Sequence, residues 1–144
     1  MTVVGFNFNK INVERAKPLQ GKISINNNIS IKGVENKDLS LGSAKQSGLK
    51  VAFEYGVVYS NEAKEKLANL DLEGEVLLLE QDAKVKDIVK DWDKSKKLSK
   101  EMTMQVLQTA LSKCNIQAII LSRDLNLPTP IPLPKVEVDE KAPA

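Results

Sequence analysis

The sequence predicts an α+β fold, in which a four-stranded antiparallel sheet carries one long and one short helix packed on one face. Three observations lead to this prediction. Residues 3–60 contain segments in which apolar and polar side chains alternate, which is the pattern of strands with one buried face. Residues 82–121 instead carry apolar side chains at the spacing of amphipathic helices. A segment with four prolines, residues 128–134, then ends the helical region, because proline lacks a backbone donor and disfavours helix at the residue before it.

A chain of 144 residues is long enough for one hydrophobic core. We expect a single domain over residues 1–135, followed by a polar, disordered tail over residues 136–144. The net charge of +2 is too small to indicate nucleic acid or an acidic membrane surface as a partner. No apolar run reaches the roughly 18 residues of a membrane helix, and residues 1–10 lack the basic-then-apolar order of a signal peptide. We therefore expect a cytoplasmic protein without membrane insertion.

The first two predicted strands differ in how regularly they alternate. Between residues 3 and 16 the alternation of apolar and polar residues changes phase, because Phe6 and Phe8 are at even positions whereas Ile11 and Val13 are at odd positions. A β-bulge near residues 9–10 would return both pairs to one face, which predicts a kinked edge strand. Residues 22–32 place isoleucines on one side and polar residues on the other. One face of the sheet is therefore expected to be covered and the other solvated.

The next segments predict a connection and a second pair of strands. The polar residues 33–48 are interpreted as a long loop. Residues 49–60 alternate again and carry three aromatic residues on one face, so they predict the third strand. A short helical turn is expected within residues 61–74, with Asn61 as its N-cap, and residues 75–81 form the fourth strand. Because residues 76–79 are apolar on both faces, this strand is expected to be central or covered twice.

Two helices are predicted in the second half of the chain. The first covers residues 82–92, a basic segment at residues 94–97 separates the two, and Ser99 is a candidate N-cap for the second. The apolar stripe of the second helix broadens from residue 116 to include Ile119 and Ile120, which is more than one sheet can bury. This excess indicates a second contact, most simply another copy of the same helix across a two-fold axis. The predicted oligomer-interface residues are Val106, Leu107, Ala110, Leu111 and Cys114.

No motif predicts catalysis, a cofactor or a metal site. The chain has no histidine, which removes the commonest metal ligand and the commonest general base near neutral pH. It also has no Gly-rich phosphate loop, Cys-x-x-Cys pair or nucleophile elbow. The single cysteine, Cys114, cannot form an internal disulfide, which leaves a bridge between two chains open, and it is expected to be a buried, inert thiol. We therefore predict a protein that is not an enzyme and that uses no cofactors.

The proline-rich segment after the second helix is apolar as well as extended. Leu127, Ile131 and Leu133 stand between prolines that cannot donate hydrogen bonds to a sheet, so they form an ordered ribbon. The ribbon can close the core, or it can line one wall of an apolar groove whose other wall is formed by strand aromatics. Exposed apolar grooves mark binding sites for other chains. The sequence leaves both interpretations open.

The order of these parts resembles the SecB family of protein-export chaperones, in particular archaeal SecB-like proteins that end in a proline-rich Leu-Asn-Leu motif. The likeness rests on Phe6-Asn7-Phe8 followed by Ile11 in a long first strand, and on a long helix leading directly into Leu125-Asn126-Leu127 and Pro128. It implies a dimer of dimers with helices at the interface, which holds unfolded polypeptides, including preproteins for export, without hydrolysing nucleotide. Bacterial SecB is strongly acidic and docks on the motor SecA, whereas this chain is slightly basic.

The leading hypothesis is an ATP-independent holdase or polypeptide-binding adaptor. It would act as a homo-oligomer, a dimer or a dimer of dimers, and hold unfolded clients by apolar contacts and strand-like backbone pairing. The predicted groove residues are Phe6, Phe8, Phe53, Tyr55, Leu127, Ile131 and Leu133. An alternative is a nucleic-acid- or ribosome-associated protein that uses the lysines from Lys84 to Lys100, although interleaved carboxylates are typical of a solvated helix face. A third is a structural module that binds one folded partner.

Overall fold

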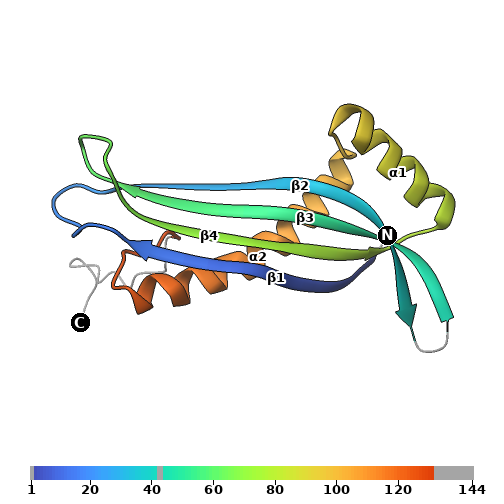
Figure 1. Cartoon of the computed structure of the whole chain (residues 1–144), viewed down its shortest axis with the longest axis horizontal. Coiled ribbons are helices and arrows are strands. Elements are labelled where there is room, and N and C mark those ends of the chain that lie inside the picture. The colour runs from blue at the N-terminus through green and yellow to red at the C-terminus, as the bar shows by residue number, and fades with distance from the viewer. Residues whose placement is uncertain (1, 42–43, 132–144) are drawn as a thin grey trace, which may run out of the picture.

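A computed structural model describes residues 2–41 and 44–131 (Figure 1). Four strands come first and two helices follow. They are β1 (Thr2–Arg15), β2 (Ser24–Leu41), β3 (Ala44–Ser60), β4 (Lys66–Leu79), α1 (Asp82–Ser95) and α2 (Lys100–Asp124). The strands form one antiparallel sheet in the order β1-β4-β3-β2, so the predicted α+β fold class is confirmed. The expected tail, residues 136–144, lies outside the described residues.

The two central strands supply most of the core because they alternate strictly. On β3 every odd-numbered residue from 49 to 59 is buried, and on β4 every even-numbered residue from 68 to 78 is buried. Residues that pair across antiparallel strands point to the same face, and the register pairs Tyr55 with Leu72. These side chains therefore form one continuous apolar layer beneath the helices. The central position expected for β4 is confirmed.

α2 crosses the covered face of the sheet on the diagonal, from the β2 side to the β1 side (Figure 1). Its buried residues recur at every fourth position, and they are Met102, Val106, Ala110, Cys114, Ala118 and Ser122. Four residues rotate about 40° beyond a full turn, so this stripe winds slowly around the helix. The later members are small, which lets the helix backbone approach the large rings of β3 closely. Ser99 begins α2 as predicted, because its Oγ accepts a hydrogen bond from the Met102 N–H at 3.3 Å.

α1 packs on one end of the sheet, against β2 and β3. Val85 and Trp92 are its buried residues, and they lie one above the other at the helical spacing predicted from the sequence. The helix ends at Lys96, which adopts a left-handed conformation with φ of 57° and donates its backbone N–H to the Trp92 carbonyl. The predicted break between the two helices is therefore confirmed.

The β-bulge predicted in β1 is confirmed by the pairing of β1 with β4. Phe8 pairs with Gly74 and Lys10 pairs with Glu73, so Asn9 is the extra residue. Ile11 then pairs with Leu72 on the covered face, as the phase slip required. β1 and β2 are the two edges of the sheet, and both carry such a bulge.

The loop predicted for residues 33–48 is wrong, because most of this segment belongs to strands. β2 continues to Leu41 and pairs with β3 down to Ala44. A bulge between Ile31 and Gly33 moves the buried positions of β2 from odd to even numbers, so that Val34 is buried. Because the alternation changes phase at this bulge, the sequence pattern does not show that the strand continues. Since β4 ends where Leu79 pairs with Gly48, residues 37–41 and 44–47 extend beyond it as a two-stranded arm.

The helical turn predicted within residues 61–74 is also wrong. β4 already begins at Lys66, and residues 61–65 form a tight connection between β3 and β4. The Asn61 side chain does cap this connection, since its Oδ1 accepts a hydrogen bond from the Glu65 N–H at 2.9 Å. Its role is therefore to close a strand-to-strand turn and not to begin a helix.

The face of the sheet opposite the helices is polar and carries cross-strand ion pairs. Lys32 on β2 lies 2.7 Å from Glu54 on β3, and this carboxylate raises the pKa of Lys32. Lys50 on β3 lies 3.4 Å from Glu35 and 3.7 Å from Glu75. This arrangement agrees with the sequence prediction of one covered and one solvated face.

Candidate functional site

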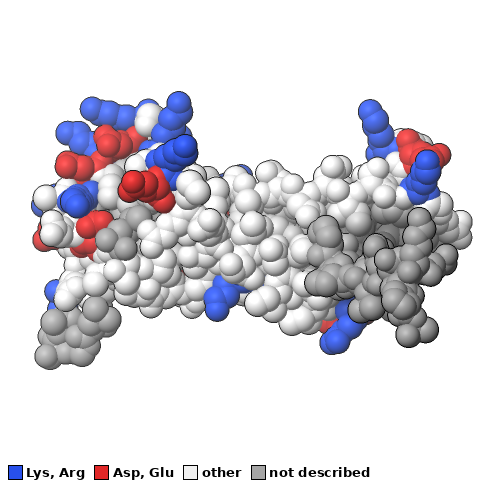
Figure 2. Space-filling model, turned by 180° about the vertical axis from the view of Figure 1, so that it is seen from behind, with Lys and Arg blue, Asp and Glu red and all other residues white. Residues whose placement is uncertain are grey.

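The solvent-facing side of α2, which we call the outer face, is formed by apolar and uncharged residues. Met104, Ile116 and Ile120 are 52%, 61% and 41% exposed. Each lies two positions after a buried residue, and two positions rotate about 200° around a helix, so these side chains point away from the sheet. Between Met102 and Ser122 the only charged residue is Lys113. Figure 2 shows this face as a broad white expanse, interrupted by a basic side chain, between two charged ends.

The five predicted interface residues do not lie on the outer face. Val106, Ala110 and Cys114 are completely buried against the sheet of their own chain, so they belong to its core. Leu107 is half-buried and Leu111 is 37% exposed, on the flank of the helix. The sequence correctly indicated that α2 carries more apolar surface than the sheet covers, but three of the five residues it named for a second contact belong to the core. The four-residue rhythm that places Ile116 and Ile120 outward was the available signal.

Three phenylalanines form a cluster on the covered face near the start of β1. The ring centroids of Phe6 and Phe53 lie 5.3 Å apart in a stacked arrangement, and those of Phe6 and Phe8 lie 4.9 Å apart, edge to face. Phe53 is buried, while Phe6 and Phe8 on the edge strand are half-buried. Gly74 makes the cluster possible, because a side chain there would collide with the Asn7 carbonyl and with the Phe53 ring. These rings therefore combine core packing with some accessible aromatic surface.

Two tyrosines of β3 lie beneath α2 and differ in their hydrogen bonding. The Tyr59 hydroxyl donates to the Pro128 carbonyl at 2.7 Å. The Tyr55 hydroxyl is the one buried side-chain polar atom of residues 2–41 and 44–131 that has no hydrogen-bond partner. Burial raises the pKa of both tyrosines and of Cys114 to about 12. The thiol of Cys114 therefore stays protonated at neutral pH, which supports its prediction as an inert core residue.

We expect Tyr59→Phe to lower the free energy of unfolding by about 1 kcal/mol, because the Pro128 carbonyl loses its partner. Tyr55→Phe removes a hydroxyl that makes no hydrogen bond, so it is expected to leave the free energy of unfolding unchanged or raise it slightly. Urea unfolding of the two variants at one protein concentration measures the difference. Equal losses in both variants would contradict the hydrogen-bond assignment.

The ribbon after α2 closes the core at the far end of the sheet. Leu127 is 7% exposed and belongs to the apolar core. Backbone carbonyls of the ribbon accept hydrogen bonds from three strands, namely from Arg15 of β1, Tyr59 of β3 and Asn27 of β2, at 3.2, 2.7 and 2.9 Å. The sequence left open whether the ribbon closes the core or lines a groove, and at Leu127 it closes the core. Ile131 packs half-buried against it, and Leu133 lies outside the described residues.

The predicted groove residues are therefore not gathered in one groove. Phe53 lies six residues before Tyr59 on β3, which separates the phenylalanine cluster from the ribbon by roughly 20 Å along the strand. Phe6, Phe8 and Phe53 lie together, Tyr55 is covered by α2, and Leu127 and Ile131 lie at the far end. Apolar hollows do occur, but they lie along α2.

Two such hollows flank α2 near its two ends. One, of about 610 Å³, is lined by Leu19, by Ile119 and Arg123 of α2, and by the ribbon residues 126–129. The other, of about 330 Å³, lies between β2, α1 and α2, and its apolar walls come from Ile31, Trp92, Leu98 and Leu107. The sequence assigned Leu127 to a groove and Leu107 to an oligomer interface, but it predicted neither hollow, because the walls of each come from separate segments of the chain.

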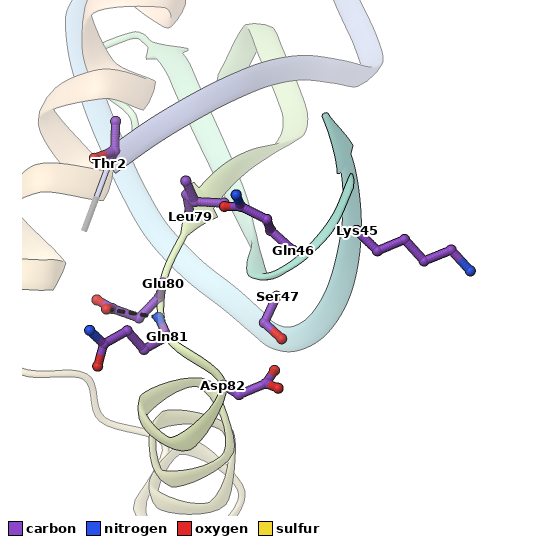
Figure 3. A pocket seen from close by; sticks show the side chains of 8 residues that line it. All are labelled: Thr2, Lys45, Gln46, Ser47, Leu79, Glu80, Gln81 and Asp82. Carbon is purple, nitrogen blue, oxygen red and sulfur yellow. Dashed lines mark hydrogen bonds between the residues drawn. The ribbon is translucent and has the colours of Figure 1, made fainter. Parts of the chain in front are cut away.

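A third cavity, of about 560 Å³, lies where the arm leaves the sheet and α1 begins (Figure 3). It is lined mainly by polar residues, among them Gln46, Ser47, Gln81 and Asp82. Figure 3 shows the Lys45 side chain extending away from the cavity. A carboxylate at the first residue of α1 opposes anion binding at this helix N-terminus.

Within the described part of the chain, no three or more cysteine, aspartate and glutamate side chains are placed to hold a metal ion. Neither α1 nor α2 is long and apolar enough to span a membrane.

No protein-family model matches this sequence, and no curated protein is significantly similar to it. Among solved structures, the chain is similar to the Mycobacterium tuberculosis Rv1957 SecB-like chaperone, determined in complex with a ChAD peptide from the Rv1956 HigA1 antitoxin. The match has a TM-score of 0.59 at 10% sequence identity and covers 96% of this chain and 91% of the other. At this identity the likeness establishes a shared fold.

Proposed function

We propose that this protein is an ATP-independent chaperone that binds unfolded polypeptide segments in the apolar hollows beside α2. The observation that carries the proposal is the fold, which follows a peptide-bound SecB-like chaperone over nearly the whole chain. The uncharged surface of α2 adds to it, since exposed apolar surface of this extent marks a site for other chains. Preproteins for export are one class of client that such a chaperone would hold.

The proposed client contacts are the accessible apolar side chains around α2. Ile119 and the ribbon form the hollow at one end of the helix, and Ile31 and Leu107 belong to the hollow at the other end. Phe6 and Phe8 offer aromatic surface at the β1 edge, where an extended client could also pair with the free backbone groups of the strand. Phe53, Tyr55 and Leu127 support these walls from within the core.

The outer face of α2 is the proposed contact between copies of the chain. Met104, Ile116 and Ile120 are too exposed to be covered by their own sheet, and a two-fold axis would let each helix cover the other. The proposed assembly is a dimer or a dimer of dimers. The sequence-predicted residues Leu107 and Leu111 would take part at its margin.

The test is suppression of aggregation of an unrelated protein diluted from denaturant, with the mass of the chaperone measured by light scattering. We expect suppression at stoichiometric amounts without ATP, and a mass of two or four chains. No suppression at any ratio would refute the proposed function. A tight complex with one folded protein and none with unfolded chains would instead indicate an interaction module.

The variant Ile116→Glu with Ile120→Glu is expected to lower the measured mass, because four charges would meet at a two-fold contact. The matched control is Val4→Glu with Val58→Glu, which alters two similarly exposed aliphatic residues on β1 and β3. We expect the control to keep the mass of the unchanged chain. An unaltered mass in the α2 variant would show that the outer face is not the contact.

The lysines of α1 do not favour the nucleic-acid alternative, because carboxylates alternate with them along the helix (Figure 2). A salt titration separates the two functions, since phosphate binding weakens steeply with salt and apolar client binding does not.

A further inference from the structure

The hollow between β2, α1 and α2 is apolar inside and basic at its rim. Ile31, Leu98 and Leu107 form walls, together with the indole of Trp92. Its volume of about 330 Å³ is enough for one or two aliphatic side chains. We call this hollow the Trp92 pocket.

The lysines at the rim of the Trp92 pocket, and those next to them in the sequence, have no carboxylate partners. Lys94, Lys96, Lys97 and Lys100 fall within seven consecutive residues that contain no acidic residue. All four are exposed, and Lys96 and Lys97 line the pocket itself. No ion pair in the described part of the chain includes any of them, whereas Lys32 and Lys50 on the opposite face of the sheet are both paired.

The geometry around Trp92 brings one of these charges over the apolar wall. The Lys96 Nζ lies 5.8 Å from the centroid of the Trp92 ring, which is within the range of a cation–π contact. The left-handed conformation of Lys96 ends α1 at this point, so Lys96 and Lys97 project from the connection between the helices and not from a helix face. A ligand side chain in the pocket would therefore enter beside the positive charges of Lys96 and Lys97.

We infer that the Trp92 pocket selects client segments in which an aliphatic side chain is flanked by carboxylates. The inference rests on the proposed function and assigns a client chemistry to one of its hollows. The apolar walls favour a leucine- or isoleucine-sized side chain. The unpaired lysines favour aspartate or glutamate beside it, because each exposed ion pair adds a factor of roughly 1.5 to 5 in affinity.

Three labelled ten-residue peptides test this selectivity. Each has a central Leu-Ala-Leu flanked on each side by two glutamates, two glutamines or two lysines, and the remaining three positions are glycine and serine in all three peptides. In fluorescence anisotropy at low salt, the glutamate peptide is expected to bind about tenfold more tightly than the glutamine peptide, and the lysine peptide least tightly. The preference should shrink as salt is raised, because exposed charges are screened. Trp92 is the only tryptophan of the chain, so its emission should shift on binding.

Two charge-reversed variants locate the preference. Lys96→Glu with Lys97→Glu changes the pocket rim and is expected to weaken binding of the glutamate peptide about tenfold while strengthening that of the lysine peptide. Lys84→Glu with Lys86→Glu makes the same change in net charge on an exposed part of α1 and is expected to alter the affinity less than twofold. All four lysines are exposed, so neither variant removes core packing.

The outcomes separate this inference from the proposed function. If the lysine peptide binds as tightly as the glutamate peptide, or if both variants weaken binding equally, the selectivity is refuted while the chaperone function stands. If no peptide binds and no aggregation is suppressed, both are refuted. If a poly-uridine oligonucleotide displaces the glutamate peptide and binds more tightly, the rim recognises phosphates and the inference is also overturned.

Discussion

Leu127→Asp is expected to lower the free energy of unfolding by about 4 kcal/mol. The change removes an apolar side chain that is 7% exposed, a loss of roughly 2–3 kcal/mol. It also places a carboxyl group in the core, which adds about 1–3 kcal/mol of desolvation. The ribbon would then detach from Tyr59 and Asn27. Urea unfolding followed by Trp92 fluorescence measures this loss, at one protein concentration because oligomers unfold in a concentration-dependent way.

Asn126→Asp is the matched control for the ribbon. It introduces the same carboxylate one residue earlier, at an exposed position with φ of 54°, a conformation that aspartate tolerates. We expect its free energy of unfolding to stay within about 0.5 kcal/mol of the unchanged chain. If Leu127→Asp proves equally mild, the ribbon is not part of the core and Leu127 becomes a candidate client contact.

Gly74→Ala is expected to lower the free energy of unfolding by about 3 kcal/mol, at the upper end of overpacking effects. The added methyl group would collide with the Asn7 carbonyl on β1 and lie 2.8 Å from Cζ of Phe53. Because the Asn7 carbonyl belongs to the backbone, β1 must move away from β4 to admit the methyl group. The phenylalanine cluster would be disturbed at the same time, so client binding at the β1 edge should fall as well.

Gly56→Ala controls for the general effect of replacing a strand glycine. The nearest atom to its added methyl group is Oδ1 of Asp71 at 3.7 Å, an ordinary contact distance. Alanine gives the unfolded chain fewer conformations than glycine does. We therefore expect the free energy of unfolding of this variant to be unchanged or to rise by about 0.4–1 kcal/mol. If the free energy of unfolding falls equally in Gly56→Ala and Gly74→Ala, the cause is the general effect of replacing a strand glycine and not the close contact between residue 74 and the Asn7 carbonyl.

The sheet could be predicted from the sequence wherever one face is buried along a whole strand. The strict alternation of residues 49–59 identified β3, and the parity change between Phe8 and Ile11 identified the bulge in β1. The arm formed by residues 37–41 and 44–47 escaped prediction because it extends past β4 and has little core to face. Its strands are held by backbone hydrogen bonds, which leave almost no alternation of apolar and polar residues in the sequence.

The candidate site was less predictable than the fold. Apolar excess on α2 was visible in the sequence, but the four-residue rhythm that turns Cys114 inward and Ile116 outward was interpreted as an interface and not as the stripe that faces the sheet. The ribbon could be read as core or groove, and its contacts with Tyr59 and Asn27 depend on tertiary structure. Likewise, the Trp92 pocket joins residues separated by more than sixty positions, such as Ile31 and Trp92, which no local pattern connects.

The hydrogen bond from Arg15 to the Leu125 carbonyl joins residues 110 positions apart and has a consequence for synthesis of the chain. β1 leaves the ribosome before β4, its partner in the sheet, and this end of the core is covered only when the ribbon arrives. Contacts of such long sequence separation slow folding, because the intervening chain must be ordered before they form. A nascent chain that ends within α2 would therefore expose Tyr59 and its neighbours, and would itself resemble the unfolded segments that the finished protein is proposed to hold.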